Sequence, residues 1–203
     1  LVELGPGRGT LMADMLHAAP LVEGFAEAIE VHMVETSPVL KAIQKQTLKN
    51  AALSEPPLWH KALADVTEGS SIIIANEFFD ALPIEQYFKA GDYWCPRVVD
   101  VKPDGDGLCF VLLPPFDDPA LPPGLINVQS DVMVEVCPAA LDITEDISRR
   151  ITEYGGAALF IDYGHSQSAP GETLQALKNH KYHDPLVDPG EVDLTAHVDF
   201  AAL

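Results

Sequence analysis

The chain has 203 residues, 47% of them hydrophobic, which is enough to bury a core of its own. Its formal net charge of −19 opposes binding to nucleic acid, whose phosphate backbone is also negative, and favours cationic partners weakly. No apolar run approaches the roughly 18 residues of a membrane span and no signal-peptide pattern opens the sequence, so we expect neither membrane insertion nor secretion.

Three cysteines, Cys95, Cys109 and Cys137, are far apart and form no C-x-x-C pair. This pattern favours reduced thiols that serve as packing residues over a disulfide framework. A bacterial cytoplasm and a mitochondrial matrix are both compatible with it.

The first predicted elements are a strand, a glycine turn and a helix. Leu1 and Val2 are predicted to end a strand, and the stretch ELGPGRGT, residues 3–10, then places glycine at positions 5, 7 and 9. Hydrophobic residues recur after it at helical spacing, at Leu11, Met12, Met15 and Leu16. Strand, turn and helix together make half of a βαβ unit.

A second strand and helix are predicted next. The stretch IEVHMVE, residues 29–35, alternates as a strand does, and Ser37-Pro38 is typical of a helix start. The buried face of that helix is predicted from Val39, Leu40, Ile43 and Leu48. The run IIIA, residues 72–75, is continuously apolar, which predicts a strand covered on both faces in the middle of a parallel sheet.

The segment from about residue 87 to residue 137 has a different pattern. Its stretches YWCPRVVDV and LCFVLL flank a turn at residues 104–107, which predicts a β-hairpin, and a proline-rich loop follows. We interpret 87–137 as a β-rich insertion in an α/β core.

Downstream, an amphipathic helix is predicted to end at Gly155-Gly156, and the stretch AALFID, residues 157–162, predicts another buried strand. The helix is marked by Leu141, Ile143, Ile147, Ile151 and Tyr154. Alternating strands and helices predict an α/β fold with a doubly wound, mostly parallel sheet, and 1–203 as a single domain. Residues 199–203 look like the first turns of a helix, so we expect a domain truncated at both ends.

The glycine turn is the predicted ligand site, because ligands of open α/β sheets bind beyond the carboxyl ends of the strands. Its spacing, G-x-G-x-G, differs from the G-x-G-x-x-G of dinucleotide-binding proteins. Two acids accompany it, Glu3 before the turn and Glu35 at the end of the second strand, and carboxylates suit a cationic cofactor better than a pyrophosphate. Glu35 can also serve only as a partner of the helix dipole.

This arrangement resembles the first motif of class I S-adenosylmethionine-dependent methyltransferases, which have a Rossmann-like fold. The resemblance implies that the loop of Gly5, Gly7 and Gly9 accommodates the methionine part and the ribose of S-adenosylmethionine. It also implies that Glu3 lies near the amino group of this cofactor and that Glu35 holds both ribose hydroxyls.

Five segments narrow the resemblance to the MidA-like family: ELGPGRGTLMADML, VETSPVLKAIQ, ANEFFDALPIEQY, ALFIDYG and GEVDLTAHVDF. Members of this family are S-adenosylmethionine-dependent protein arginine methyltransferases linked to the assembly of respiratory complex I, and they are longer at both ends. The resemblance implies methyl transfer to a guanidinium nitrogen of a protein substrate, such as a complex I subunit.

Candidate catalytic residues follow the strands that carry this resemblance. Glu77 and Glu85, after the predicted strand at residues 72–75, are candidates for a carboxylate clamp on arginine, by similarity to better-studied arginine methyltransferases, although their spacing of eight is not that of those enzymes. Asn76 is a candidate for hydrogen bonding the cofactor, and Asp162 for lining the substrate pocket. Structural alternatives stay open: Glu85 can face solvent, and Asn76 and Asp162 can cap strand ends.

The polar stretch of residues 180–200 is interpreted as a loop over the mouth of the site, in which Asp193 and His197 contact substrate. A metal site at His180 and His183 is an alternative that the interrupting prolines disfavour, and methyl transfer of this kind needs no metal. Two other functions stay open. One is a non-catalytic assembly factor that keeps the fold. The other is an NAD-dependent oxidoreductase, which the glycine spacing disfavours.

Overall fold

The computed structural model describes residues 1–203 except 50, 52, 54, 117 and 118. It divides into two compact units, one of Leu1–Phe78 with Ile143–Asp162 and one of Phe79–Asp142 with Tyr163–Leu203. No helix among the described residues is long and apolar enough to cross a membrane.

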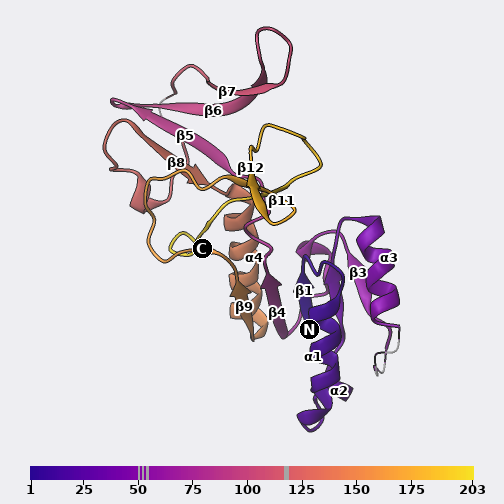
Figure 1. The fold of residues 1–203 in the computed structure, drawn as a ribbon. Helices are drawn as coiled ribbons and strands as arrows, with labels where there is room; N and C mark the ends of the chain where they lie inside the picture. Colours follow the sequence, from indigo (N-terminus) through magenta and orange to yellow (C-terminus); the bar gives the residue numbers. More distant parts are fainter. Residues whose placement is uncertain (50, 52, 54, 117–118) are drawn as a thin grey trace. The chain divides into compact units, whose positions relative to one another are not determined.

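The first unit is built on a five-stranded parallel sheet (Figure 1). The strands lie in the order β3-β2-β1-β4-β9, so the chain moves outward from β1 on one side and from β4 on the other. This confirms the predicted α/β fold with a doubly wound parallel sheet. The strand bounds are β1 (Val2–Leu4), β2 (His32–Val34), β3 (Leu58–His60), β4 (Ser71–Asn76) and β9 (Gly156–Ile161).

The helices of this unit begin and end largely where local sequence signals place them. Ser37 Oγ accepts a hydrogen bond from the Leu40 N–H at 3.3 Å, which confirms the predicted N-cap. A buried apolar cluster joins α1, β2 and the end of α3: Met12, Leu16, Val31, Met33 and Leu48. The helices are α1 (Thr10–Ala18), α2 (Phe25–Ala28), α3 (Pro38–Thr47) and α4 (Pro138–Tyr154), with short 3-10 turns η1 (Ala19–Leu21) and η2 (Leu63–Asp65). The start of α4, up to Asp142, belongs to the second unit.

The buried face of α3 differs from the prediction. Val39 is 68% exposed, whereas Gln44 is 0% exposed. At 100° per residue the two side chains lie roughly 140° apart around the helix, so both cannot face the sheet. The helix turns Gln44 and Leu48 inward because the Gln44 amide forms hydrogen bonds with Gly7, Glu35 and Trp59.

Two predicted strands also differ from the structure. The second strand was predicted over residues 29–35, and β2 covers only His32–Val34. The strand at 157–162 was predicted to be buried, but β9 is mostly exposed, with Leu159 at 53% and Ile161 at 46%. Within the described residues β9 is an edge of the sheet and pairs only with β4, which leaves its outer side accessible.

The second unit contains a four-stranded antiparallel sheet of order β7-β6-β5-β8 (Figure 1). The predicted hairpin is confirmed as β6 and β7, which are paired antiparallel. Trp94, Leu125 and Val134 are buried together beneath this sheet. The bounds are β5 (Glu85–Ala90), β6 (Tyr93–Val101), β7 (Leu108–Leu112), η3 (Pro123–Leu125) and β8 (Val132–Val136).

The C-terminal stretch predicted as a loop forms strands instead. β11 (Gln175–Lys178) pairs antiparallel with β12 (Lys181–His183) and with β13 (Asp193–Thr195), and β10 (Gly164–His165) pairs with β14 (Val198–Asp199). Asn179 and His180 form the connection between β11 and β12, with positive φ of 52° and 61°. Positive φ at both positions suits a two-residue hairpin turn, which explains why this polar segment is ordered as a sheet.

The predicted helix at 199–203 is likewise replaced by the end of β14 and a turn, in which Ala202 N–H donates to Asp199 Oδ1 at 3.2 Å. The three cysteines are free thiols, as predicted, and each is partly buried.

Candidate functional site

The carboxyl ends of neighbouring strands in the first unit meet at one edge of the parallel sheet. In register, Leu4 lies opposite Val34 on one side and Ala75 on the other. Asn76, one residue further, lies opposite Ile161. The predicted site residues that end or follow these strands therefore lie along a single edge, where the strand order reverses: Gly5, Glu35, Asn76, Glu77 and Asp162.

The glycine loop, residues 5–9, has a backbone that requires glycine for two different reasons. φ is 58° at Gly5, 51° at Gly7 and 78° at Gly9. A Cβ at Gly5 would lie 2.7 Å from Phe78 Cδ2, and one at Gly9 would lie 3.3 Å from Gln44 Cγ. At Gly7 no described atom lies within 4 Å of that position. Gly5 and Gly9 thus permit close packing, while Gly7 leaves bare backbone open to a ligand.

Glu35 follows β2, and its carboxylate is held by two hydrogen bonds. Ser37 N–H donates to Oε1 at 2.7 Å, and Gln44 Nε2 donates to Oε2 at 3.0 Å. A carboxylate has about four acceptor positions, so these bonds orient the group and leave capacity for two further donors. Two vicinal hydroxyls are donors of that kind.

Glu3 lies in the middle of β1 and is 3% exposed. Burial raises the pKa of its carboxyl to about 7, an effect that the backbone N–H of Met12 in α1 partly offsets. Its Oε2 has no hydrogen-bond partner among the described residues. Glu3 is therefore a buried acid beside the first turn of α1, and its predicted place near the amino group of the cofactor stays a prediction.

Glu77 directly follows β4 in an uncommon conformation. Its side chain is exposed and its φ is 45°, in the left-handed region that non-glycine residues seldom adopt. The Glu77 N–H donates to Ile161 O at 2.8 Å, and the next N–H, of Phe78, donates to Asp162 Oδ2 at 3.2 Å. The neighbouring strand and Asp162 thus hold a backbone that presents an acid, and strain of this kind is typical of functional sites.

Asn76 is the last residue of β4 and is half-buried. Asp162 was a candidate for lining the substrate pocket, and the structure gives it the capping bond to Phe78 that was the alternative. Its predicted contact with substrate stays a prediction.

Glu85 begins β5 and belongs to the second unit, whereas Glu77 and Asp162 belong to the first. Tyr87 Oη donates a hydrogen bond to Glu85 Oε2 at 2.6 Å. Burial and this carboxylate raise the pKa of Tyr87 to about 12. Glu85 is exposed and has a partner on its own strand, so its role in a clamp stays a prediction.

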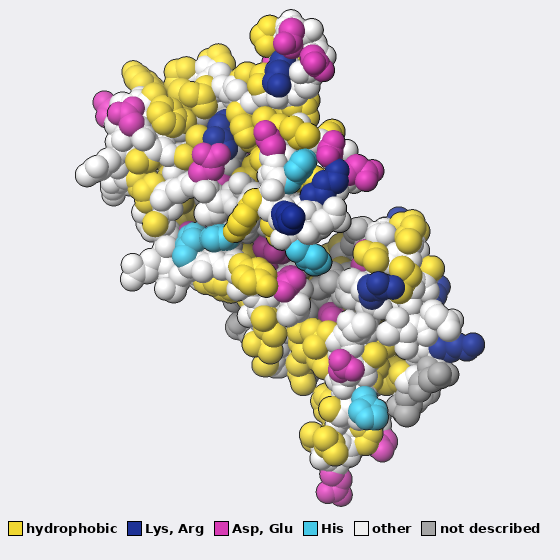
Figure 2. All heavy atoms as spheres, viewed as in Figure 1, with side chains coloured by type: hydrophobic (Ala, Val, Ile, Leu, Met, Phe, Trp, Pro, Cys, Tyr) yellow, Lys and Arg dark blue, Asp and Glu magenta, His cyan; other side chains and the backbone are white. Residues whose placement is uncertain are grey.

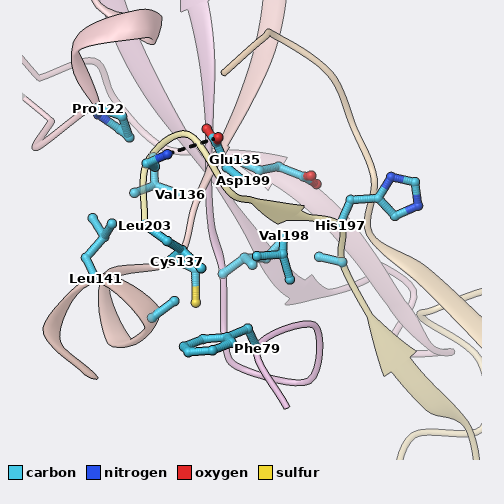
Figure 3. A pocket seen from close by; sticks show the side chains of 14 residues that line it. Phe79, Pro122, Glu135, Val136, Cys137, Leu141, His197, Val198, Asp199 and Leu203 are labelled. Carbon is cyan, nitrogen blue, oxygen red and sulfur yellow. Dashed lines mark hydrogen bonds between the residues drawn. The ribbon is translucent and has the colours of Figure 1, made fainter. Parts of the chain in front are cut away.

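A small hollow of about 40 Å³ lies in the second unit (Figure 3). Figure 3 shows the Cys137 thiol pointing toward Phe79, while the His197 ring points away from the other labelled side chains. Burial raises the pKa of the Cys137 thiol, which keeps it protonated. His197 borders this hollow, and Asp193 lies exposed on β13. Both residues belong to the second unit, whereas the glycine loop belongs to the first.

Two side chains of α3 that reach the glycine loop were not predicted from the sequence. Gln44 Nε2 donates to Gly7 O at 2.8 Å, and Thr47 Oγ1 donates to Arg8 O at 2.9 Å. The available signal was a glutamine four residues before Leu48, on the same face of the helix as an apolar residue. A polar residue at such a position marks a buried hydrogen-bonding role.

On the face shown in Figure 2, lysine and arginine side chains of the described residues are scattered among aspartates and glutamates. They form no continuous basic patch on that face.

Comparison with known proteins agrees with this geometry. Residues 1–203 match the family described as "Putative S-adenosyl-L-methionine-dependent methyltransferase". The mitochondrial protein arginine methyltransferases NDUFAF7 of Mus musculus and Homo sapiens are each 40% identical, over 100% of this chain and 51% and 50% of their own lengths. The chain thus spans about half the length of these curated relatives.

A solved structure is similar over nearly the whole chain. The crystal structure of a COG1565 superfamily member from Burkholderia thailandensis, bound to S-adenosyl-homocysteine, has a TM-score of 0.77 and 29% identity. The similarity covers 99% of this chain and 53% of that one. The strand order, the glycine loop and these matches lead to one assignment: the chain belongs to the family of S-adenosyl-L-methionine-dependent methyltransferases.

Proposed function

We propose that this chain binds S-adenosylmethionine and forms part of an enzyme that methylates arginine in a protein substrate. The observation that carries the proposal is the pairing of an open glycine backbone at Gly7 with the fixed carboxylate of Glu35 at the edge where the strand order reverses. The relatives named protein arginine methyltransferases support the choice of arginine.

The residues present fit this cofactor. Glu35 has acceptor capacity for the two ribose hydroxyls, and Gly5, Gly7 and Gly9 shape the loop on which the methionine part would lie. Glu3 places an acid inside the unit near that loop, where negative charge favours an ammonium group. Asn76 is proposed to donate a hydrogen bond to the cofactor. The bound sulfonium supplies an activated methyl group.

The acids after the strands suit arginine as the acceptor. A guanidinium stays protonated at any working pH, so the protein has to orient its plane and balance its charge. Glu77 is proposed to accept hydrogen bonds from the guanidinium, with Asp162 fixing the backbone that presents it. Glu85 is proposed as the second carboxylate of the clamp.

The substrate is proposed to be a protein, because the relatives carry that activity in their names. Those relatives are also named mitochondrial, and we propose that the enzyme acts on a respiratory complex I subunit in the matrix or in the corresponding bacterial cytoplasm.

Binding of the cofactor tests the proposal first. Calorimetric titration of the full-length protein with S-adenosylmethionine is expected to show saturable binding, and Glu35→Ala is expected to weaken it tenfold or more, about 1.4 kcal/mol, because the ribose hydroxyls lose their acceptor. NAD serves as the control ligand and is expected not to bind. Tight NAD binding without S-adenosylmethionine binding would favour an oxidoreductase, and binding without turnover on any protein would favour an assembly factor.

The pH dependence of this affinity follows from the raised pKa of Glu3. In the free protein the carboxyl has a pKa of about 7 and is largely protonated at pH 6. A bound ammonium favours the ionised form of Glu3, so binding at pH 6 requires the carboxyl to release its proton. At pH 7 about half of the free protein has already lost that proton, and the affinity is therefore expected to rise roughly fivefold from pH 6 to pH 7.

Two comparisons isolate this effect. Glu3→Gln is expected to flatten the pH profile, because the titrating group is gone. 5′-Methylthioadenosine, which lacks the ammonium, is expected to bind wild type with little pH dependence. Equal profiles for both ligands would assign the pH effect to another group.

A further inference from the structure

The amide of Gln44 connects three parts of the cofactor-binding edge. Its Nε2 donates to Gly7 O at 2.8 Å and to Glu35 Oε2 at 3.0 Å, and its Oε1 accepts from Trp59 Nε1 at 2.9 Å. These partners come from the glycine loop, the end of β2 and β3, while Gln44 itself lies on α3. One side chain therefore holds the loop and the ribose-binding carboxylate at once.

The geometry allows only one orientation of this amide. Turning it over would place its oxygen against the Gly7 carbonyl and the Glu35 carboxylate, and its NH₂ group against the Trp59 N–H. The side chain is 0% exposed, so water cannot replace a lost partner without a rearrangement of the site. Both N–H donors are used, and the position of Glu35 is tied to that of Gly7.

The packing around Gln44 supports the same conclusion. A Cβ at Gly9 would lie 3.3 Å from Gln44 Cγ and 3.5 Å from its Cα, so the loop lies directly against this part of α3. Thr47, one turn later, donates to Arg8 O at 2.9 Å. α3 thus contacts the carbonyls of two successive loop residues from one side.

We propose that Gln44 is a positioning residue that fixes Glu35 and the glycine loop relative to each other, and so sets the selectivity for a ligand with free ribose hydroxyls. Without it, Glu35 keeps the Ser37 bond to one oxygen but loses the bond that orients the other. The loop and the carboxylate would then bind their parts of the ligand independently, with weaker preference for the ribose. The inference rests on the proposed function, because it assigns the ribose to Glu35.

The test compares two ligands on each variant of the full-length protein. Wild type is expected to bind S-adenosyl-homocysteine about tenfold more tightly than its 2′-deoxy analogue, because one acceptor of Glu35 then has no hydroxyl partner. Gln44→Met, which has a similar shape but no amide, is expected to bind S-adenosyl-homocysteine at least tenfold more weakly and to discriminate less than threefold. This ratio is measured within one protein, so the fraction of folded protein does not affect it.

Matched variants separate positioning from structure. Gln46→Met makes the same change at an exposed site of the same helix and is expected to keep the wild-type ratio. Trp59→Phe removes the third partner but leaves both donor bonds of Gln44, and it is expected to keep discrimination of at least fivefold. Gln44→Leu, which likewise lacks the amide, replaces Gln44→Met if the latter does not fold.

The outcomes test the proposed function and the role of Gln44 separately. A wild-type protein that binds neither ligand would overturn the proposed function and this inference with it. A wild type that discriminates, beside a folded Gln44 variant with the same ratio, would overturn the role of Gln44 alone. Loss of the ratio in the Gln44 variant, with the Gln46→Met ratio intact, would support it.

Discussion

Replacing Glu77 by glutamine is expected to reduce the rate of methyl transfer about a hundredfold or more at saturating cofactor, while the affinity for S-adenosyl-homocysteine changes less than about threefold. Glutamine keeps the size of the side chain and removes the charge that is proposed to orient and balance the guanidinium. The hydrogen bonds of the Glu77 and Phe78 N–H groups hold this backbone at a φ of 45° and do not involve the Glu77 carboxylate, so the change is expected to act on the carboxylate. Turnover on a substrate protein and calorimetric binding measure the two effects.

Control variants limit what this result can mean. Glu27→Gln removes one exposed acid from α2 and is expected to leave turnover unchanged. Glu85→Gln is expected to reduce turnover as well if two carboxylates share the guanidinium. Wild-type turnover in Glu77→Gln would remove Glu77 from the mechanism, and a loss confined to Glu77 would assign Glu85 to the surface.

Replacing Arg150 by methionine is expected to lower the free energy of unfolding by about 3 to 5 kcal/mol. The Arg150 side chain is 5% exposed, and its Nε donates to Asp146 Oδ2 at 3.1 Å. Its two Nη atoms donate to Val66 O at 3.1 Å and to Leu63 O at 3.0 Å. Methionine would leave two backbone carbonyls inside the first unit without the donor they have, and it would remove one of the two arginines that donate to Asp146.

The neighbouring residue provides a matched control for denaturant unfolding. Arg149 is 41% exposed and pairs with Asp146, Glu153 and Glu68 at the surface. Exposed pairs contribute little, so Arg149→Met is expected to lower the free energy of unfolding far less than Arg150→Met does. Similar losses of unfolding free energy for the two variants would show that burial of the Arg150 hydrogen bonds adds little to stability.

The sequence predicted the elements whose signals are local. Ser37 and Pro38 predicted the start of α3, and the glycine loop and Glu35 were predicted to meet at the carboxyl ends of the strands, where they lie. Both depend on neighbouring residues or on a spacing that the parallel sheet enforces. The same signals could not show that Gly9 is glycine because α3 lies against it.

The remaining differences arise from tertiary contacts. Val39 has the right spacing for a buried face, but the partners of Gln44 decide which face α3 turns inward. The strand β9 is apolar, yet it lies at the edge of the sheet within the described residues. Asn179 and His180 adopt positive φ without a glycine, so the turn between β11 and β12 carried no strong signal. The burial of Glu3 likewise depends on how α1 packs on β1.

The close contact between Gly9 and Gln44 also constrains how this site can change over evolutionary time. A side chain at position 9 would push the Gln44 side chain away by a few tenths of an ångström, and a smaller residue at position 44 would give up the bonds to Gly7 and Glu35. Neither substitution is neutral by itself, so the two positions are expected to be inherited together. We therefore expect the last glycine of the motif to be selected for its contact with a neighbouring helix as well as for the ligand.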